Sequence, residues 1–223
     1  MKKAFSWIKN NILFLETLFL LAFIPLYPKL PLVNVKHTWV YVRVEDFLIV
    51  GVIVTWVIFL LKKKISLRTP LTLPILAFWF LGAISTIHGV VLIFPTISNV
   101  FPNVAFLSYL RHIEYIGLFF IAFAGIKEKK FVPVVITVIV LNLIFITFYG
   151  FGQRILSFPA FLTMNEEYAK GTPIILSKLS RIPSTFAGHY DLAAYLVLVI
   201  PILVSLMFAI KNLLVKAAFL SSL

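Results

Sequence analysis

The sequence contains no cysteine, which excludes disulfide bonds and metal sites built on thiolates. Charged residues are also scarce: they make up 13% of the chain, where a soluble domain has about a quarter. The four histidines are scattered, without the paired spacing of a metal-ligand set. No glycine-rich phosphate loop and no internal repeat is present. We therefore predict no metal and no other cofactor.

What the chain has in quantity is apolar surface. Hydrophobic residues form 61% of its 223 positions, and its mean hydropathy is +1.06. A water-soluble fold cannot bury that much apolar surface, so the composition predicts a membrane protein. The net charge of +12 is compatible with nucleic acid, but basic residues of membrane proteins collect in cytoplasmic loops. We expect no nucleic-acid partner.

Six apolar runs approach the length that a helix needs to cross the hydrocarbon core, about 20 residues. They cover residues 12–26, 47–61, 71–94, 107–126, 131–150 and 192–210. The first two are short and need flanking residues to span, and a seventh run, 213–223, is too short. The pattern predicts an all-α, polytopic transmembrane helical bundle with six spanning helices and a truncated seventh. We expect residues 1–223 to form a single transmembrane domain at the N-terminal end of a longer protein.

Basic residues alternate between the connectors of these runs. Twelve of the 20 lie in four short segments: Lys2, Lys3 and Lys9; Lys62, Lys63, Lys64 and Arg68; Lys127, Lys129 and Lys130; Lys211 and Lys216. The positive-inside rule makes these segments cytoplasmic, which places the N-terminus inside and the other connectors outside. A signal peptide would also begin with lysines, but no small-residue cleavage site follows the first run, so we interpret it as an uncleaved helix.

The longest outward connector covers residues 151–191 and is predicted to be an extracytoplasmic loop. Loops of this length are usually either functional or disordered. Apolar pieces at 155–162 and 174–176 predict short helices that lie on the outer membrane surface.

Arginine gathers on the predicted outer side, where the positive-inside rule does not require it. Four of the five arginines lie there: Arg43, Arg111, Arg154 and Arg181. A planar guanidinium binds phosphate through two donors at once, so this set suits an anionic, lipid-borne ligand. For each arginine taken alone, the alternative remains open that its side chain reaches toward lipid headgroups.

Two further side chains support these arginines. His189 follows Arg181 at the start of the sixth run, where Asp191 can cap a helix whose N-terminus attracts anions. His189 can donate to such an anion or accept a proton near neutral pH. Asp46 opens the second run, three residues after Arg43, with which it can pair. Its alternative role is that of an acid stabilising a helix N-terminus.

Three polar residues fall inside apolar runs, namely Glu16, His88 and Asn142. Ionisable residues at membrane depth are often functional, but Glu16 and His88 lie near the ends of their runs. A lone asparagine more often forms a hydrogen bond between two helices, and we expect that of Asn142.

The chain resembles the superfamily of O-antigen ligases and O-antigen polymerases in three stretches. Family members carry an arginine, small residues, a Gly-His-Pro-Asn-like turn and Leu-Ala at a helix start, similar to RIPSTFAGHYDLAAYLVLVIPIL here. Their Pro-rich outer turn and Arg-x-x-Asp before the second helix resemble IPLYPKLPLV and VYVRVEDFLIV. Their fourth-helix region resembles YLRHIEYIGLFF. The chain departs from the family at Tyr190 and Asp191, which replace the usual Pro-Asn.

The resemblance implies a multi-pass glycosyltransferase of the bacterial inner (plasma) membrane that builds cell-envelope polysaccharide such as lipopolysaccharide. Such an enzyme moves a glycan, without a metal, from a polyprenyl-diphosphate carrier to a glycan or lipid acceptor outside the cytoplasm. Arg181 matches the family arginine and is the first candidate for binding the diphosphate, while Arg43 and Arg111 match less closely. The family's catalytic histidine lies in a later outer loop, so no catalytic residue is assigned to this chain.

Two other functions remain open: a polytopic transporter of anions or lipid-linked sugars, and a membrane subunit without activity. Transporters usually bind near the middle of the bilayer, often at broken helices. Here the polar residues gather at the predicted outer ends of the runs, which favours the enzyme.

Overall fold

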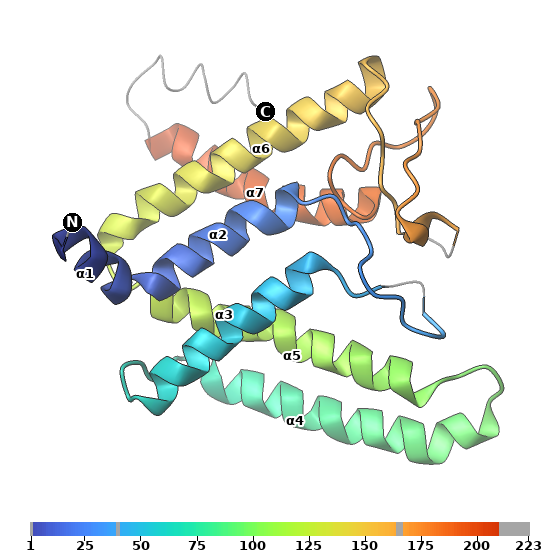
Figure 1. The fold of residues 1–223 in the computed structure, drawn as a ribbon, viewed down its shortest axis with the longest axis horizontal. Coiled ribbons are helices and arrows are strands. Elements are labelled where there is room, and N and C mark those ends of the chain that lie inside the picture. The colour runs from blue at the N-terminus through green and yellow to red at the C-terminus, as the bar shows by residue number, and fades with distance from the viewer. Residues whose placement is uncertain (1, 39–40, 164–166, 210–223) are drawn as a thin grey trace. The chain divides into compact units, whose positions relative to one another are not determined.

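A computed structural model describes residues 2–38, 41–163 and 167–209. Within those ranges the fold is all-α, as predicted, with seven α-helices and no strand (Figure 1). The helices are α1 (Lys2–Asn10), α2 (Ile12–Leu26), α3 (Val44–Leu61), α4 (Thr72–His88), α5 (Pro102–Gly125), α6 (Val132–Ile155) and α7 (His189–Ala209). The truncated seventh run expected at 213–223 lies outside the described residues.

Five of the described helices are long and apolar enough to cross a membrane, which indicates a multi-pass membrane protein. These segments are Val44–Leu61, Thr72–Thr96, Pro102–Gly125, Lys129–Ile155 and His189–Ala209. The prediction of six spanning helices is therefore confirmed for five. The remaining helix, α2, has 15 residues and ends at Leu26. Its end has a local cause, because Pro28 disfavours helical backbone at the residue before it.

Two predicted bounds differ from the structure in ways that move candidate residues. Helix α5 begins at Pro102 instead of residue 107, because proline is favoured in the first turn of a helix. Arg111 therefore lies nine residues inside α5, about 14 Å along its axis, and not at its end. Helix α7 begins at His189, so Asp191 lies in its first turn and is not the N-cap that the sequence predicted.

The long connector runs from residue 156 to 188, between α6 and α7. The prediction of short surface helices at 155–162 and 174–176 is wrong for the described part of this connector. That part holds one 3-10 turn, Tyr168–Lys170, and an antiparallel bridge between Ala160 and Ile174. Backbone hydrogen bonds across the connector have replaced the predicted local helices.

The chain divides into two compact units. The first comprises Met1–Thr17, Lys36–Thr38 and Asp46–Lys129. The second comprises Leu18–Val35, Trp39–Glu45 and Lys130–Leu223.

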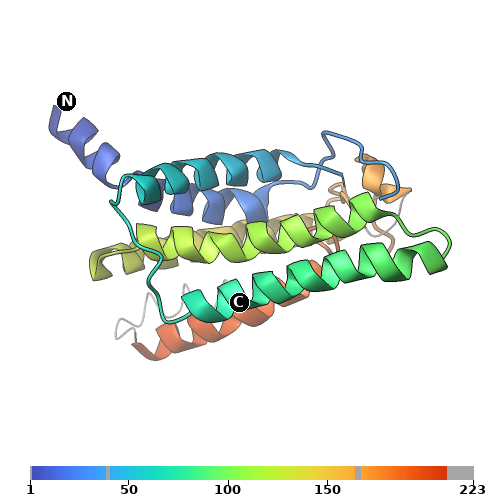
Figure 2. The ribbon, with the colours of Figure 1, turned by 90° about the horizontal axis from the view of Figure 1, so that it is seen from below.

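Aromatic rings pack the helices of the first unit together. The ring of Phe120 on α5 lies 6.1 Å from Trp56 of α3 and 6.0 Å from Trp79 of α4, centroid to centroid. Tyr109 donates to the Trp79 carbonyl over 2.8 Å, and a Cβ on Gly82 would lie 3.1 Å from the Tyr109 ring. Glycine thus allows α4 and α5 to lie side by side, as Figure 2 shows.

Helices α3 and α5 of the first unit run in the same direction. Asp46 meets Arg111 near the start of α3, and Trp56 meets Phe120 further along both helices. The lysine-bearing connectors that follow these two helices, at 62–71 and 126–128, therefore leave from the same end of the unit. That arrangement is what the positive-inside rule requires.

In the second unit, α6 packs against α7 and the last part of α2. Leu143 of α6 and Leu203 of α7 belong to one buried apolar cluster. Asn142, which is 2% exposed, donates from its side-chain amide to the Leu21 carbonyl of α2 over 2.7 Å. The predicted role of Asn142 as a hydrogen bond between helices is confirmed.

Sidedness is testable because the chain has no native cysteine. We expect Lys170→Cys to react with a membrane-impermeant maleimide in intact cells, and Lys62→Cys to stay unlabelled. Both lysines are exposed, so reactivity reports the side of the membrane. Lys62 is preferred to Lys63, whose φ of 54° strains any side chain. Permeabilised cells should label both variants equally, and the reverse pattern in intact cells would invert the topology.

Candidate functional site

The candidate site lies in the second unit, where the 156–188 connector folds back onto the end of α6. Gln153 in the last turns of α6 is 2% exposed and binds both ends of the connector. Its amide nitrogen donates to the carbonyls of Pro159, over 3.1 Å, and Ser184, over 2.9 Å. Its amide oxygen accepts from the Ser184 backbone N–H over 3.0 Å. One side chain thus closes the connector into a loop.

Ser184 sits at the centre of this arrangement in a backbone conformation that L-residues rarely adopt, with φ of 54°. Its hydroxyl donates to the Ile146 carbonyl of α6 over 2.6 Å. Next to it, Thr185 donates to the Pro25 carbonyl at the end of α2 over 2.5 Å. These bonds hold the segment that leads into α7 against two helices.

We expect Gln153→Met to lower the free energy of unfolding by about 1–3 kcal/mol, because the buried N–H and carbonyl of Ser184 lose their partner and the Pro159 carbonyl keeps only its bond from Tyr149. Methionine keeps the length of the side chain and removes its hydrogen bonds. Thermal unfolding in detergent, followed by the intrinsic tryptophan signal, measures the loss. The matched control is Thr137→Val, an exposed change on the same helix that should stay within about 0.5 kcal/mol. Equal effects of the two changes would show that Gln153 does not hold the connector.

Arg181 and His189 meet where the connector enters α7. Nη1 of Arg181 lies 3.0 Å from Nε2 of His189, the first residue of the helix. A guanidinium only donates, so Nε2 accepts, and the histidine ring is neutral with its proton on Nδ1. Among the described residues, the pair thus offers four guanidinium N–H groups that make no hydrogen bond, and an Nδ1 proton, at the positive end of a helix dipole. That combination suits an anion.

The pair lines a cavity of about 340 Å³. The other lining residues are Leu162, Tyr168, Ile174, Ile175, Leu176, Ser180 and Pro183. Ligand sites commonly have volumes of about 300–1,000 Å³ and mix apolar walls with a few polar groups. Three polar side chains of the lining can donate hydrogen bonds, those of Tyr168, Ser180 and Arg181, and the fourth polar side chain is that of His189. The cavity therefore has the chemistry of a small anionic group bound next to apolar walls.

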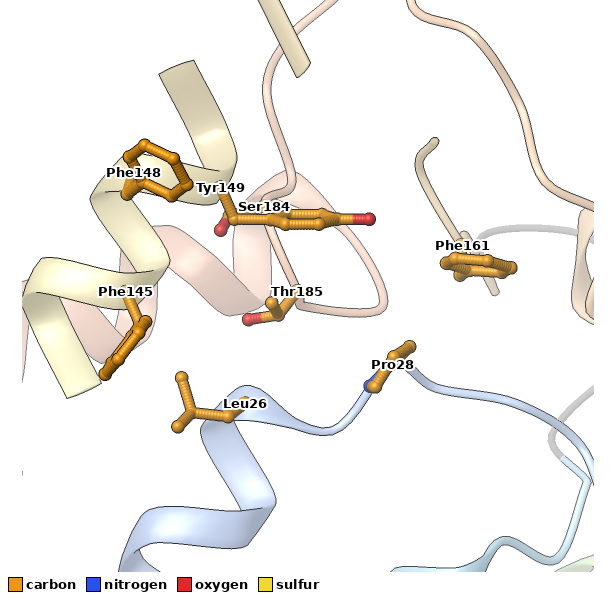
Figure 3. Close-up of a pocket in the computed structure, with 8 residues that line it drawn as sticks. All are labelled: Leu26, Pro28, Phe145, Phe148, Tyr149, Phe161, Ser184 and Thr185. Carbon is orange, nitrogen blue, oxygen red and sulfur yellow. The ribbon is translucent and has the colours of Figure 1, made fainter. Parts of the chain in front are cut away.

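A second cavity, of about 370 Å³, is almost wholly apolar (Figure 3). Its walls are Leu26, Pro28, Phe145, Phe148, Tyr149, Phe161, Ser184 and Thr185. The two hydroxyls at Ser184 and Thr185 donate to backbone carbonyls, and Tyr149 donates to the Pro159 carbonyl over 2.8 Å. No hydroxyl proton of these three residues is left for a ligand, so the cavity suits an apolar chain.

The two cavities share one thin wall. Phe161 and Ser184 line the apolar cavity, whereas their chain neighbours Leu162 and Pro183 line the cavity of Arg181. Both cavities therefore depend on the same connector segments that Gln153 holds.

Arg43 lies in a separate, buried ionic cluster of this unit. Its Nη1 is 3.2 Å from Glu45 Oε1, and its Nη2 donates to the Thr163 hydroxyl over 3.2 Å. Glu45 also pairs with Lys29, whose ammonium donates to the Ile24 carbonyl over 2.7 Å. These three ionic residues are 5–8% exposed. Such burial with internal partners favours a structural role for Arg43 over the predicted binding of diphosphate.

Burial has an electrostatic consequence for Lys29. Loss of water around the ammonium lowers its pKa, and the carboxylates of Glu45 and Asp191 oppose that change. Glu45 is therefore the main anion that favours the charged form of Lys29. Lys29 and Glu45 were not predicted from the sequence, where the only available signal was a lysine between two prolines in an apolar stretch.

The remaining predicted residues occupy other places. Arg154 donates from Nη1 to the Ser177 carbonyl over 3.2 Å, at the end of α6. Arg111 belongs to the first unit, where its Nη2 lies 3.3 Å from Asp46 Oδ2. Of the predicted set, the structure brings Arg181 and His189 together at a cavity. A diphosphate site shared by all four arginines stays a prediction, as does a pair between Arg43 and Asp46.

Comparison of the chain with protein-family models, curated proteins and solved structures finds no match in any of the three. The resemblance to O-antigen ligases and polymerases stays a prediction from three short stretches.

Proposed function

We propose that this chain binds a polyprenyl-diphosphate-linked glycan at the extracytoplasmic face of a bacterial inner membrane and takes part in transferring the glycan to an acceptor. The observation that carries the proposal is the Arg181–His189 pair in a cavity at the first turn of the apolar helix α7. A planar guanidinium and a helix N-terminus both favour phosphate oxygens. The protein would be a glycan ligase or polymerase.

The neighbouring apolar cavity supports the same ligand. A polyprenyl diphosphate is an amphiphile whose anionic head and apolar chain need two adjoining environments of opposite character. Phe145 and Phe148 of α6 line the apolar cavity and are themselves exposed, so a chain from the surrounding lipid can reach it without crossing polar surface. The polar cavity of Arg181 lies across the shared wall.

Charge at the leaving group sets the role of each residue in this proposal. When the glycan departs, negative charge grows on the diphosphate, and a positioned guanidinium stabilises that charge in the transition state. Arg181 has this role. His189 holds the guanidinium of Arg181 in place and donates a further hydrogen bond to the diphosphate from Nδ1. The acceptor hydroxyl needs a general base, for which no described residue is assigned.

The position of the pair argues against the alternative of a transporter. Transporters of anions or lipid-linked sugars bind their cargo near the bilayer midplane. Arg181 and His189 lie at the end of a span instead. An inactive subunit would bind the lipid without supporting transfer, and the two readouts below separate that case from the enzyme.

The first experiment is a comparison of ligands. We expect the purified protein in lipid nanodiscs to bind geranylgeranyl diphosphate and not geranylgeraniol, which has the same chain without the phosphates. A glycan-transfer assay in cells is the second readout. Equal binding of the two ligands would refute the phosphate site, while selective binding without transfer would identify a non-enzymatic subunit.

A further inference from the structure

A four-residue turn near the end of the connector holds a leucine out of the protein. The Ser180 N–H donates to the Ser177 carbonyl over 3.1 Å, which places Lys178 and Leu179 at the tip of a turn. Leu179 is 97% exposed, the highest value among the large apolar side chains described, and Lys178 beside it is exposed as well. Turn tips ordinarily carry glycine, proline or small polar residues.

The exposure of Leu179 is built into a turn with several internal bonds. The Ser177 N–H donates to the Ser180 hydroxyl over 3.2 Å, and the two serine hydroxyls lie 2.8 Å apart. Arg154 adds a bond from α6 to the Ser177 carbonyl. The two ends of the turn are thus cross-linked to each other and tied to a helix, with Leu179 at the exposed tip.

The level of this turn relative to the membrane follows from Arg154. The apolar span that contains α6 runs from Lys129 to Ile155, so Arg154 lies at its last turn. Ile155 and Leu156, at the same helix end, are exposed. The turn is therefore anchored where a spanning helix leaves the hydrocarbon and meets the headgroups.

We propose that the turn at Ser177, Lys178, Leu179 and Ser180 docks on the membrane interface, with anionic phospholipid as its partner. Leu179 enters the boundary between headgroups and acyl chains, and Lys178 and Arg154 lie among the lipid phosphates. An apolar tip flanked by cations has the chemistry of interfacial membrane segments. Docking keeps the connector, with Arg181 two residues beyond Leu179, at headgroup height. This inference is independent of the proposed glycan transfer.

The test uses single cysteines labelled with the environment-sensitive dye NBD, in liposomes of phosphatidylcholine and phosphatidylglycerol. The probed variant is Leu179→Cys, and the matched control is Lys170→Cys, an exposed site in the same connector. At position 179 we expect blue-shifted emission and, from a nitroxide on the upper acyl chain, about twofold more quenching than at position 170. A water-soluble nitroxide should show the reverse preference.

Lipid charge supplies the second arm of the test. In pure phosphatidylcholine the lipid-borne quenching at position 179 should fall, and adding Lys178→Gln should weaken this dependence on phosphatidylglycerol, because Arg154 is then the cation that remains. Equal quenching of the dye at positions 179 and 170 would overturn the proposal. So would quenching at position 179 by the water-soluble nitroxide and not by the lipid-borne one. So would a blue shift seen in native membranes and absent from liposomes, because that result would identify a protein partner in place of lipid.

Discussion

Glu45→Gln is expected to lower the free energy of unfolding by about 3–5 kcal/mol, the loss typical of removing one partner from a buried ionic cluster. The change keeps the size of the side chain and removes the negative charge that lies between Lys29 and Arg43. Two cations then share a buried site whose main anion is gone. Thermal or denaturant unfolding of the purified protein, followed by tryptophan fluorescence, measures the loss.

Removing the lysine of the same cluster should change the stability far less than removing the glutamate. Lys29→Met leaves Arg43 and Glu45 as a balanced pair, and it removes an ammonium whose ionisation burial already disfavours. We expect a change within about 1 kcal/mol. The double variant with Glu45→Gln should be more stable than Glu45→Gln alone. Glu167→Gln, at an exposed carboxylate of the same unit, is the control and should be silent. Equal losses from the lysine and the glutamate changes would contradict this account.

The lowered pKa of Lys29 also gives a pH dependence with a definite sign. Between its lowered value in the folded protein and the ordinary lysine value of about 10.4, the unfolded chain binds more protons than the folded one. Stability contributed by this group therefore rises as the pH rises through that window. Lys29→Met removes the contribution, so wild type and variant should converge at the alkaline end.

Residues that act through local pattern were predictable, and residues that act through distant backbone groups were not. Runs of apolar residues identify spanning helices from length alone, and Asn142 inside such a run indicated a bond between helices because no water is available there. Gln153 carries no comparable signal. Its partners are backbone groups 6 and 31 residues away, and any sequence supplies backbone groups.

The candidate site shows the same division. Arg181 and His189 were predicted together, since the sequence places them at one helix start, and they do make contact. Arg43 was grouped with them by its predicted side of the membrane and by a less close match to the family that the sequence resembles. Its actual partner Thr163 is 120 positions away, so composition and sidedness could not reveal that its guanidinium is already occupied. The predicted side of the membrane tells at which end of the helices a residue lies. Which residues it contacts there depends on the path of the connectors.

Replacing Arg181 by alanine should have the largest effect on function. We expect glycan transfer to fall by about 100- to 1,000-fold, the loss typical of removing one positioned donor from a developing oxyanion. The side chain is exposed and its described hydrogen bond is to His189. Membrane insertion and thermal stability should therefore stay unchanged. Transfer in cells and binding of geranylgeranyl diphosphate by the purified protein are measured in parallel.

Arg181→Lys separates charge from geometry at this position. Lysine keeps the positive charge, but as a point charge it loses the planar fork that binds two phosphate oxygens at once. We therefore expect the rate of glycan transfer by Arg181→Lys to lie between the rates of the wild type and Arg181→Ala. Arg68→Ala, an exposed arginine of the lysine-bearing connector, is the control and should transfer normally. If Arg181→Ala transfers glycan at the wild-type rate, Arg181 is no part of a donor site. If it loses transfer but still binds the diphosphate selectively, the guanidinium acts on the leaving group in the transition state and not on donor capture.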